Sequence, residues 1–585
     1  MQDVSDATKT SSVMTRFYDI DLPLQKIYSS ELERPSQPFL TQPTNGQAQT
    51  WTWAEAMLEI RRVVAWITEQ KWPAGSRVVI LSKNCAWWIM ADIAIWMSGH
   101  VSVPLFPALR DDSLAALFVH CEPVACFLGE LDQLPPFHTE PLQNVKFIQF
   151  PNARPDHTAP SSENWQSIVR DGKIFEGQPV RTADDLATII YTSGTTGQPK
   201  GVMQSFRSLS LMGKSMEPAL GNSPYPLDRI LSYLPLAHIA ERAIVEMNSL
   251  MMPLHIFFTE GQQTFLQDLQ RSECTVFFSI PRLFLRFQQG VFEKVPEQKL
   301  GHLLKFPILN RIVRDKILKG LGLQHARLVA SGGAAIPVEI VHWYRRLGLN
   351  FVEGYGMTET GITHVPLPKQ FRAGFVGHAS PYAQTRISDA GEIQIKGPMN
   401  LLGYYRNPEL TRQAFTDDGY FHTGDRGEID EQGRLRIVGR LKEEFKTAKG
   451  KYVVPAPIEK LLSLSTMFES VCVLGSGMSA PFCLAVLVPD LRKETESPLS
   501  REMVSETLAL ELDRVNNQLD FHEQLRFLVV CHQPWTPDNG LLTPTLKVRR
   551  TALEERFNND FTQWEQSKKR VLWQDIDDDD KKGRT

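Results

Sequence analysis

The sequence predicts a layered α/β fold, because helical and strand-like patterns alternate along its first part. Residues 53–69 read as a helix, 77–81 as a short buried strand and 87–96 as a second helix. Such alternation is typical of parallel strands covered by helices. From about residue 383 the pattern changes to short strands between Gly-rich turns, which predicts a small β module. A chain of 585 residues is also too long for one compact core, so two or more domains are expected.

The same reading places further strands along the chain, and beyond Gly439 it predicts another α/β segment. The strands are expected at residues 101–105, 187–190, 229–234, 274–279, 326–331, 392–395, 434–438, 471–474 and 483–488. The last eleven residues, 575–585, form a charged tail that is predicted to be disordered.

Composition excludes several classes of protein. A net charge of −4 argues against nucleic-acid binding, and seven scattered cysteines without CxxC spacing fit a reducing, cytoplasmic location and argue against structural zinc. The first residues resemble no signal peptide. The most apolar window, residues 85–106, contains Asp92 and His100 and is interrupted by Gly99, so a buried helix leading into a strand is expected there. Peripheral membrane contact and homodimer formation stay open.

The most informative segment is residues 191–202, Tyr-Thr-Ser-Gly-Thr-Thr-Gly-Gln-Pro-Lys-Gly-Val, which follows a buried strand. Its glycines allow backbone N–H groups to approach an anion, its hydroxyls add donors, and Lys200 adds a positive charge. The segment therefore predicts a phosphate-binding loop. It is not a Walker A loop, because Gly201 stands where that loop has a Mg²⁺-binding Ser or Thr.

Four further segments carry groups suited to a nucleotide. Ser331–Ala335 is a second glycine cluster, and residues 353–360 combine Tyr355 for stacking with Glu359, a hard oxygen ligand for Mg²⁺. Asp425, in His-Thr-Gly-Asp, could accept two ribose hydroxyls. The charged segment 439–452 falls where a domain hinge is expected, and residues 542–550 place Lys547 after a Thr-Pro turn. Taken singly, each segment also reads as an ordinary turn or solvated loop.

Taken together and in this order, the five segments resemble the adenylate-forming superfamily of acyl-CoA synthetases, firefly luciferase and peptide-synthetase adenylation domains. The resemblance covers about residues 50–555. Leu234–Arg242 (Leu-Pro-Leu-Ala-His-Ile-Ala-Glu-Arg) and the Leu-Thr-Pro-Thr-Leu-Lys ending look like the long-chain fatty acyl-CoA synthetase branch.

The resemblance implies an α/β fold with a large N-terminal domain, made of two α/β subdomains and a small β-barrel, and a smaller mobile α+β C-terminal domain. We expect the N-terminal adenylation domain at residues 1–440, the C-terminal domain at 441–570 and the tail at 571–585.

It also implies roles for individual residues. The loop would hold the β- and γ-phosphates of ATP through Thr192, Ser193, Gly194, Thr195, Thr196, Gly197 and Lys200, with Thr192 and Glu359 binding Mg²⁺. Adenine would be framed by Gly333, Glu353, Gly354 and Tyr355, the α-phosphate touched by Thr358, and the ribose held by Asp425 and Arg440. The implied catalytic set is Lys547 for adenylation, His238 near the substrate carboxylate, Glu359, the hinge residue Lys442, and Lys446 on the face that replaces Lys547 after rotation. Glu353 departs from the neutral residue, such as Gln, expected in close relatives.

The implied reaction is ATP-dependent activation of a medium- or long-chain fatty acid to acyl-AMP with release of pyrophosphate, followed by transfer to coenzyme A. Two alternatives stay open: an acyl-adenylating ligase that loads a carrier protein, and a non-catalytic nucleotide-binding scaffold. The chain-length preference is unassigned. Met247, Leu250, Met251 and Met252 could line an acyl pocket or simply fill the core.

Overall fold

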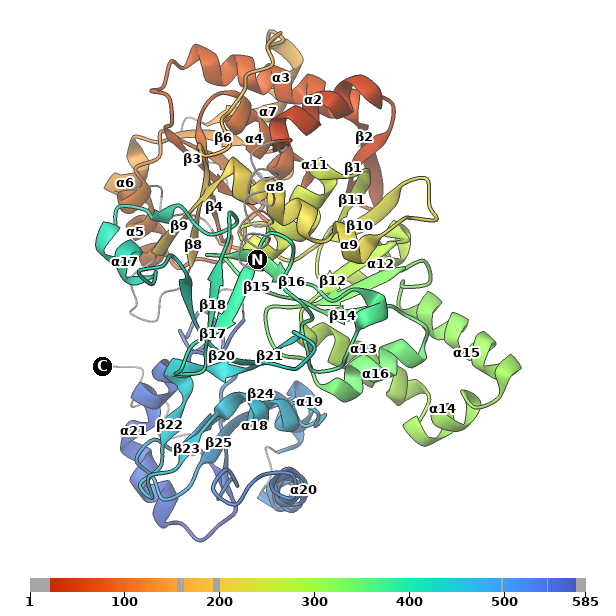
Figure 1. Cartoon of the computed structure of the whole chain (residues 1–585), viewed down its shortest axis with the longest axis vertical. Helices are drawn as coiled ribbons and strands as arrows, with labels where there is room; N and C mark the ends of the chain where they lie inside the picture. Colours follow the sequence, from red (N-terminus) through yellow and green to blue (C-terminus); the bar gives the residue numbers. More distant parts are fainter. Residues whose placement is uncertain are drawn as a thin grey trace, which may run out of the picture. The chain divides into compact units, whose positions relative to one another are not determined.

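The computed structural model describes residues 21–133, 135, 137, 139–154, 159, 162–192, 200–495, 498–543 and 546–574 (Figure 1). The chain divides into two compact units. Unit 1 comprises Met1–Ala334, Val341–Thr385 and Ile395–His422, and unit 2 comprises Ala335–Ile340, Arg386–Gln394 and Thr423–Thr585. The domain boundary expected near residue 440 stays a prediction.

An eight-stranded sheet forms the first part of unit 1, in the order β19-β9-β8-β4-β3-β5-β6-β7. The pairs from β8 to β7 are parallel, whereas β9 runs antiparallel to β8 and β19 antiparallel to β9. The parallel arrangement confirms the prediction from the alternating pattern. The strands are β3 (Arg77–Leu81), β4 (Val101–Leu105), β5 (Ala125–Leu128), β6 (Lys146–Gln149), β7 (Glu163–Asn164), β8 (Leu186–Thr192), β9 (Lys200–Ser205) and β19 (Gly403–Tyr404).

The two predicted helices of this part are confirmed as α3 (Trp53–Glu69) and α4 (Ala86–Met97). The N-terminus of α3 is closed by a capping box, in which Thr52 accepts from the Glu55 N–H and the Glu55 carboxylate accepts from the Thr52 N–H. Every residue of α4 is buried, so the most apolar window of the sequence is an interior helix that leads into β4. In the part of the chain that the structure describes, no helix combines the length and apolarity needed to span a bilayer.

A second sheet of seven strands has the order β14-β13-β12-β10-β11-β1-β2. Its pairs are parallel except β1–β2, which forms a hairpin. The strands are β1 (Pro38–Thr44), β2 (Gln47–Thr52), β10 (Asp228–Ser232), β11 (Leu254–Phe258), β12 (Val276–Ser279), β13 (Leu328–Ser331) and β14 (Phe351–Glu353).

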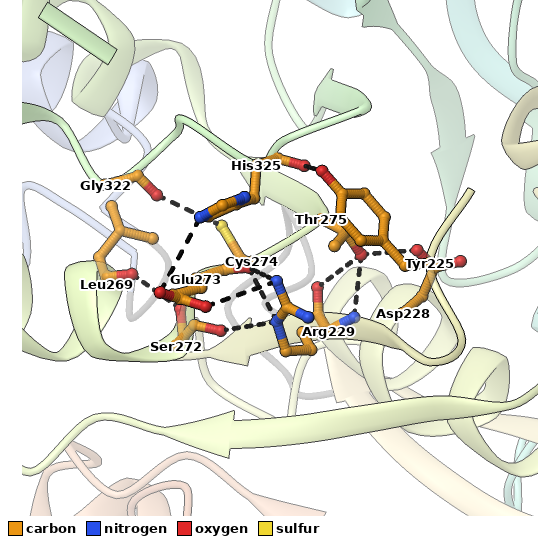
Figure 2. A network of polar contacts seen from close by, with 10 residues as sticks. All are labelled: Tyr225, Asp228, Arg229, Leu269, Ser272, Glu273, Cys274, Thr275, Gly322 and His325. Carbon is orange, nitrogen blue, oxygen red and sulfur yellow. Dashed lines mark hydrogen bonds and ion pairs between the residues drawn. The ribbon is translucent and has the colours of Figure 1, made fainter. Parts of the chain in front are cut away.

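At the amino-terminal edge of this second sheet, polar contacts join the start of β10 to the segment that leads into β12 (Figure 2). The Arg229 guanidinium donates to the carbonyls of Ser272 and Glu273, at 3.2 and 2.7–2.9 Å, and so closes the C-terminus of α12 (Phe265–Ser272). The Thr275 hydroxyl donates to Asp228 at 2.6 Å. These contacts stabilise the edge at which the strands begin. The predicted site residues lie at the opposite, carboxyl edge.

The remaining helices of unit 1 connect or cover these strands. They are α2 (Pro23–Glu33), α5 (Asp111–Cys121), α6 (Glu140–Gln143), α7 (Trp165–Asp171), α8 (Phe206–Ser215), α9 (Glu217–Leu220), α10 (Ile239–Glu241), the π-helix η1 (Arg242–Met247), α11 (Asn248–Met251), α13 (Pro281–Lys294), α14 (Glu297–Leu303), α15 (Pro307–Gly320), α16 (Val338–Arg346), the 3₁₀ turn η2 (Pro368–Gln370) and α17 (Pro408–Gln413).

The predicted change to short strands near residue 383 is confirmed, and two further short strands precede it. A hairpin is formed by β15 (Tyr355–Met357) and β16 (Gly361–His364). A four-stranded sheet has the order β17-β18-β20-β21 and occupies the place of the expected small β-barrel. Its strands are β17 (Gln384–Ile387), β18 (Glu392–Lys396), β20 (Phe421–Ile429) and β21 (Leu435–Arg440).

The C-terminal part of unit 2 is built on a sheet in the order β24-β25-β26-β27. The sequence predicts its first two strands but misses β26 and β27, which are three residues each. Its elements are the 3₁₀ turn η3 (Leu441–Glu443), β22 (Phe445–Lys446), β23 (Tyr452–Val453), α18 (Pro455–Leu462), β24 (Phe468–Leu474), β25 (Phe482–Leu487), α19 (Pro489–Glu494), α20 (Pro498–Asn516), β26 (Leu528–Val530), α21 (Arg550–Gln566) and β27 (Val571–Trp573).

The strand β27 corrects the expected start of the tail. Residues 571–573 pair in parallel with β26, and Val571 is buried, so they belong to the fold and not to a tail that begins at 571. The signal was available in Val-Leu-Trp, three apolar residues that precede the acidic run. Residues 575–585 lie outside the described residues.

Candidate active site

Several site residues predicted in unit 1 lie at the ends of strands of the second sheet or after them, at its carboxyl edge. Gly333 follows β13, Glu353 is the last residue of β14, and His238 lies in the segment after β10. Because β10, β12, β13 and β14 are parallel, their carboxyl ends share one edge. Ligands of open α/β sheets bind at this edge. The fold therefore brings together residues that are more than a hundred positions apart.

The glycine segments after β13 and β14 pack closely against each other. Ser331 and Glu353 are register partners, and the Gly354 N–H donates to the Ser331 carbonyl at 2.8 Å. A Cβ on Gly332 would lie 3.4 Å from the Gly354 carbonyl oxygen, and Gly333 has a φ of +80°, which favours glycine. These residues form a backbone-rich surface of the kind that could lie against a flat ring.

The hairpin β15–β16 carries the next three predicted residues, Tyr355, Thr358 and Glu359. A Cβ on Gly356 would lie 2.2 Å from the Gly361 carbonyl oxygen, so the hairpin closes only around glycine. The Tyr355 ring is half-buried, with its centroid 6.0 Å from that of His364. Thr358 is buried, and its carbonyl accepts from Gln204 Nε2 at 2.6 Å. This bond links the hairpin to β9, which begins at the predicted phosphate loop.

Tyr404 contacts two predicted residues, Glu359 and Lys200, at the phosphate end of the site. Its hydroxyl donates to Glu359 Oε1 at 3.1 Å, and its ring centroid lies 5.9 Å from Lys200 Nζ. Thr192 is the register partner of Lys200, because β8 and β9 flank the loop. Burial and the neighbouring Glu359 carboxylate raise the pKa of Tyr404, so its phenol remains a donor. Tyr404 is not among the residues predicted from the sequence, since a tyrosine in a Gly-Tyr-Tyr segment carries no distinctive signal.

The oxygen donors at this end fit Mg²⁺. Mg²⁺ is commonly bound through one or two carboxylates, with substrate phosphates and water completing its coordination. Glu359 provides a carboxylate and Thr192 a hydroxyl. Among the described residues, no three or more His, Cys, Asp and Glu side chains are grouped to hold a metal by themselves. The predicted loop residues Ser193, Gly194, Thr195, Thr196 and Gly197 lie outside the described residues.

The segment that carries His238 is held by Asn84. The Asn84 amide nitrogen donates to the Leu234 carbonyl at 2.6 Å, and its oxygen accepts from the Leu236 N–H at 2.9 Å. His238 then caps α10, with Nδ1 accepting from the Ala240 N–H at 3.2 Å. Asn84 follows β3 of the other sheet, about 150 positions before His238, so no sequence pattern connects the two residues.

The buried Glu241 side chain also holds the segment that carries His238. Its Oε1 accepts from the Ser232 hydroxyl and from the Tyr233 N–H, both at 2.9 Å. Burial raises the pKa of Glu241 to about 8. The Tyr233 hydroxyl in turn donates to Ser279 at 2.6 Å, which joins the ends of β10 and β12.

In unit 2, Asp425 and Arg440 lie next to each other. They are register partners on β20 and β21, and Arg440 Nε lies 2.8 Å from Asp425 Oδ1. Asp425 is buried, whereas Arg440 is exposed. The Asp425 N–H donates to the Thr423 hydroxyl at 3.1 Å, which holds the turn before the carboxylate.

The three lysines predicted for unit 2 are exposed and lie on separate elements. Lys442 lies in η3, between β21 and β22. Lys446 lies on β22, and its Nζ is 5.5 Å from the Tyr452 ring centroid. Lys547 lies in a turn closed by the Thr543 N–H, which donates to the Lys547 carbonyl at 2.8 Å, and its neighbour Leu546 has a φ of +60°. A non-glycine residue in that conformation costs free energy, so the surrounding turn must hold it there.

These features define a nucleotide-binding α/β protein whose site lies at the carboxyl edge of a parallel sheet. The chain matches the family model described as AMP-binding enzyme over residues 30–405, and it therefore belongs to this family.

Named relatives extend the comparison to nearly the whole chain. The chain is 30% identical to the long-chain-fatty-acid–CoA ligase FadD15 of Mycobacterium bovis, with 92% of this chain and 95% of the relative covered. It is 28% identical to long-chain-fatty-acid–CoA ligase 1 of Homo sapiens, with 82% and 77% covered.

Solved structures confirm the fold class. The adenylation domain of the carboxylic acid reductase from Segniliparus rugosus, in complex with AMP and a carboxylic acid, has a TM-score of 0.77 at 20% identity, with 95% of this chain and 96% of that chain covered. MatB from Rhodopseudomonas palustris, bound to ATP, has a TM-score of 0.70 at 22% identity, with 92% and 99% covered.

Proposed function

We propose that this protein is an AMP-forming fatty acid–CoA ligase. It activates a fatty acid with ATP to acyl-AMP and pyrophosphate, and then transfers the acyl group to coenzyme A. The observation that carries the proposal is the convergence of Lys200, Glu359 and Tyr404 beside β8 and β9, in a chain whose relatives over most of its length are named long-chain-fatty-acid–CoA ligases. Those names favour a long-chain over a medium-chain acid.

In the proposed first step, the substrate carboxylate attacks the α-phosphate, so negative charge approaches negative charge. Two unit charges 4 Å apart repel by about 4 kcal/mol at an effective dielectric of about 20. Positive charge placed where negative charge develops offsets this repulsion. Thr192 and Glu359 would hold Mg²⁺, which would supply part of that charge. Lys200 and the loop hold the pyrophosphate that leaves, and Tyr404 orients the Glu359 carboxylate.

The other groups position the reacting molecules. Gly333, Glu353, Gly354 and Tyr355 frame adenine, Thr358 contacts the α-phosphate, and Asp425 with Arg440 holds the ribose. His238 lies beside the carboxylate being activated, and Lys547 bridges carboxylate and α-phosphate oxygens. In the thiol step Lys446 takes the place of Lys547 after rotation about Lys442. The substrate itself is the nucleophile in the first step, so no side-chain nucleophile is needed.

The overall proposal is tested by exchange of labelled pyrophosphate into ATP. Exchange should depend on a fatty acid and rise along a ladder from medium to long chains. Absence of exchange with every acid would indicate a non-catalytic scaffold. Thioester formation with coenzyme A but not with a phosphopantetheinylated carrier protein is expected, and the reverse result would favour the carrier-loading alternative.

The role of Lys547 gives a sharper test. Lys547→Ala should slow acyl-AMP formation by about 10²–10³-fold, the usual cost of removing a group that stabilises developing charge. Conversion of supplied acyl-AMP to thioester should be largely retained. The matched control is Lys569→Ala, which removes another exposed lysine of unit 2. Equal loss of both half-reactions would contradict the assignment.

A further inference from the structure

A helical hairpin in the connection between β12 and β13 exposes apolar side chains. After β12 the chain forms α13, α14 and α15 before it enters β13, and in Figure 1 α14 and α15 project beyond α13. The exposed side chains surround the turn between α14 and α15. They are Phe306 at 59%, Ile308 at 78%, Leu309 at 42% and Ile312 at 59%.

The turn is held rigidly while its apolar side chains point outward. The Asn310 side chain donates to the Leu304 carbonyl at 2.8 Å, and the Asn310 N–H donates to the Phe306 carbonyl at 2.7 Å. Pro307 opens α15 with its backbone already set for a helix. Leu300 and Leu318 are buried and anchor the two helices. The exposed apolar residues therefore belong to a folded, hydrogen-bonded turn.

The charge of the hairpin is opposite to that of the whole chain. Residues 294–319 contain seven lysines and arginines and two acidic residues, in a protein whose net charge is −4. Several of these basic side chains are exposed on both sides of the apolar turn: Lys299, Lys305, Arg311, Lys316 and Lys319. A cluster of exposed apolar residues bordered by lysine and arginine is typical of elements that lie in the interface of an anionic bilayer.

We propose that the α14–α15 hairpin docks the protein on the surface of an anionic phospholipid bilayer. Phe306, Ile308, Leu309 and Ile312 enter the boundary between headgroups and acyl chains, and the surrounding lysines and arginines contact lipid phosphates. The positive charge around the apolar side chains favours an anionic bilayer as the partner. A purely apolar contact would not require lysines and arginines around it. The inference goes beyond the proposed reaction, and its test measures binding to vesicles and not turnover.

Sedimentation of the full chain with vesicles tests the proposal. The protein should sediment with vesicles of 70% phosphatidylcholine and 30% phosphatidylglycerol, and much less with pure phosphatidylcholine. Binding should fall when salt rises from 0.1 to 0.5 M, since screening shortens the reach of surface charge. The triple change Phe306→Ser, Ile308→Ser and Ile312→Ser should abolish most of the binding. Changing Lys305, Arg311 and Lys316 to Gln should weaken it by about fivefold per charge.

The matched control is Leu499→Ser with Met503→Ser, which removes two apolar side chains of α20 that are 72% and 66% exposed. This control should bind like the unchanged protein, and all variants should keep their far-ultraviolet circular dichroism. Equal sedimentation of the triple variant and the unchanged protein would overturn the proposal, as would failure of the unchanged protein to bind. A dimer in sedimentation equilibrium that the triple variant dissociates would instead assign the surface to a second copy of the chain.

Discussion

Tyr404 shows how one side chain links site residues that lie far apart in the sequence. It donates to Glu359, its ring lies within cation–π distance of the Lys200 ammonium, and it reaches both because β19 pairs with β9. A hydrogen bond to a metal-binding carboxylate fixes the direction of its lone pairs, and loss of such a partner typically lowers metal affinity by about 10–100-fold.

Tyr404→Phe should therefore raise the Mg²⁺ concentration needed for half-maximal adenylation by about tenfold. The phenyl ring stays beside Lys200, so the change isolates the hydroxyl. Glu359→Gln should raise the requirement further. Titrating pyrophosphate exchange with Mg²⁺ measures both effects. Tyr420→Phe, which removes a hydroxyl bonded to Gln384, is the control. An unchanged Mg²⁺ requirement in Tyr404→Phe would contradict the proposed metal position.

Two buried histidines of unit 1 give stability a defined pH dependence. Burial lowers the pKa of His255 to about 4 and that of His364 to about 3. Both rings are neutral in the folded protein at pH 5–7, whereas the unfolded chain takes up protons below about pH 6.5. Acidification therefore favours the unfolded state, and the loss continues until the folded pKa values are reached.

Between pH 6 and pH 5, each histidine should lower the free energy of unfolding by up to about 1.4 kcal/mol per pH unit. Urea unfolding at several pH values measures the slope. In the unchanged protein, Thr41 Oγ1 lies 2.8 Å from His255 Nε2, and His255→Gln keeps a donor for it. This variant should lose the contribution of His255 to the pH dependence of the free energy of unfolding. Identical slopes for this variant and the unchanged protein would show that His255 titrates normally.

At the scale of elements, the π-helix η1 is built around a buried charge. Arg242, Asp92 and Glu246 have no exposed side-chain area. Arg242 pairs with Asp92, lies 3.0 Å from Glu246, and stands over the rings of Trp88 and Trp96 at 5.4 and 5.6 Å. Burial raises the pKa of Glu246 well above its usual value, while the neighbouring Arg242 guanidinium acts in the opposite direction. This cluster joins η1 to α4 directly after the His238 segment.

Arg242→Met should lower the free energy of unfolding by about 3–5 kcal/mol, because it leaves the Asp92 carboxylate buried without its partner. Adding Asp92→Asn and Glu246→Gln should recover most of the loss, since a cluster without charge needs no counterion. Urea unfolding of the three proteins at pH 7 measures both steps. A single variant within 1 kcal/mol of the unchanged protein would mean that the charges are not essential to the packing of η1.

At the scale of the whole molecule, two half-reactions are proposed for one protein, and the proposed hinge is Lys442. Lys442→Pro fixes one backbone angle and disfavours the helical conformation of Leu441, which begins η3. Thioester formation should fall by about tenfold or more, a change of at least ~1.4 kcal/mol in barrier, while adenylation is largely kept. Lys442→Ala leaves the backbone free and is the control. Unchanged thioester formation in the proline variant would count against the hinge.

The sequence predicted much of the fold because local patterns decide which segments become buried strands and helices. Residues 53–69 and 77–81 were placed with their observed boundaries, and the apolar window at 85–106 was recognised as interior. Turn-forming glycines also indicated the change to short strands. The short strands β26 and β27 were not predicted, because three residues are too few to form a recognisable pattern. Only their pairing with neighbouring strands defines them.

By itself, the sequence determined the class of protein, since the loop at 191–202 and the four other segments carry chemistry in their residue types and order. The tertiary structure decided which distant side chains meet. Asn84 holds the His238 segment, Tyr404 joins Glu359 to Lys200, and Arg242 is enclosed by Asp92 and two tryptophans. The reason is physical: strand order and helix packing set these contacts, and neither has a signature in the residues that make them.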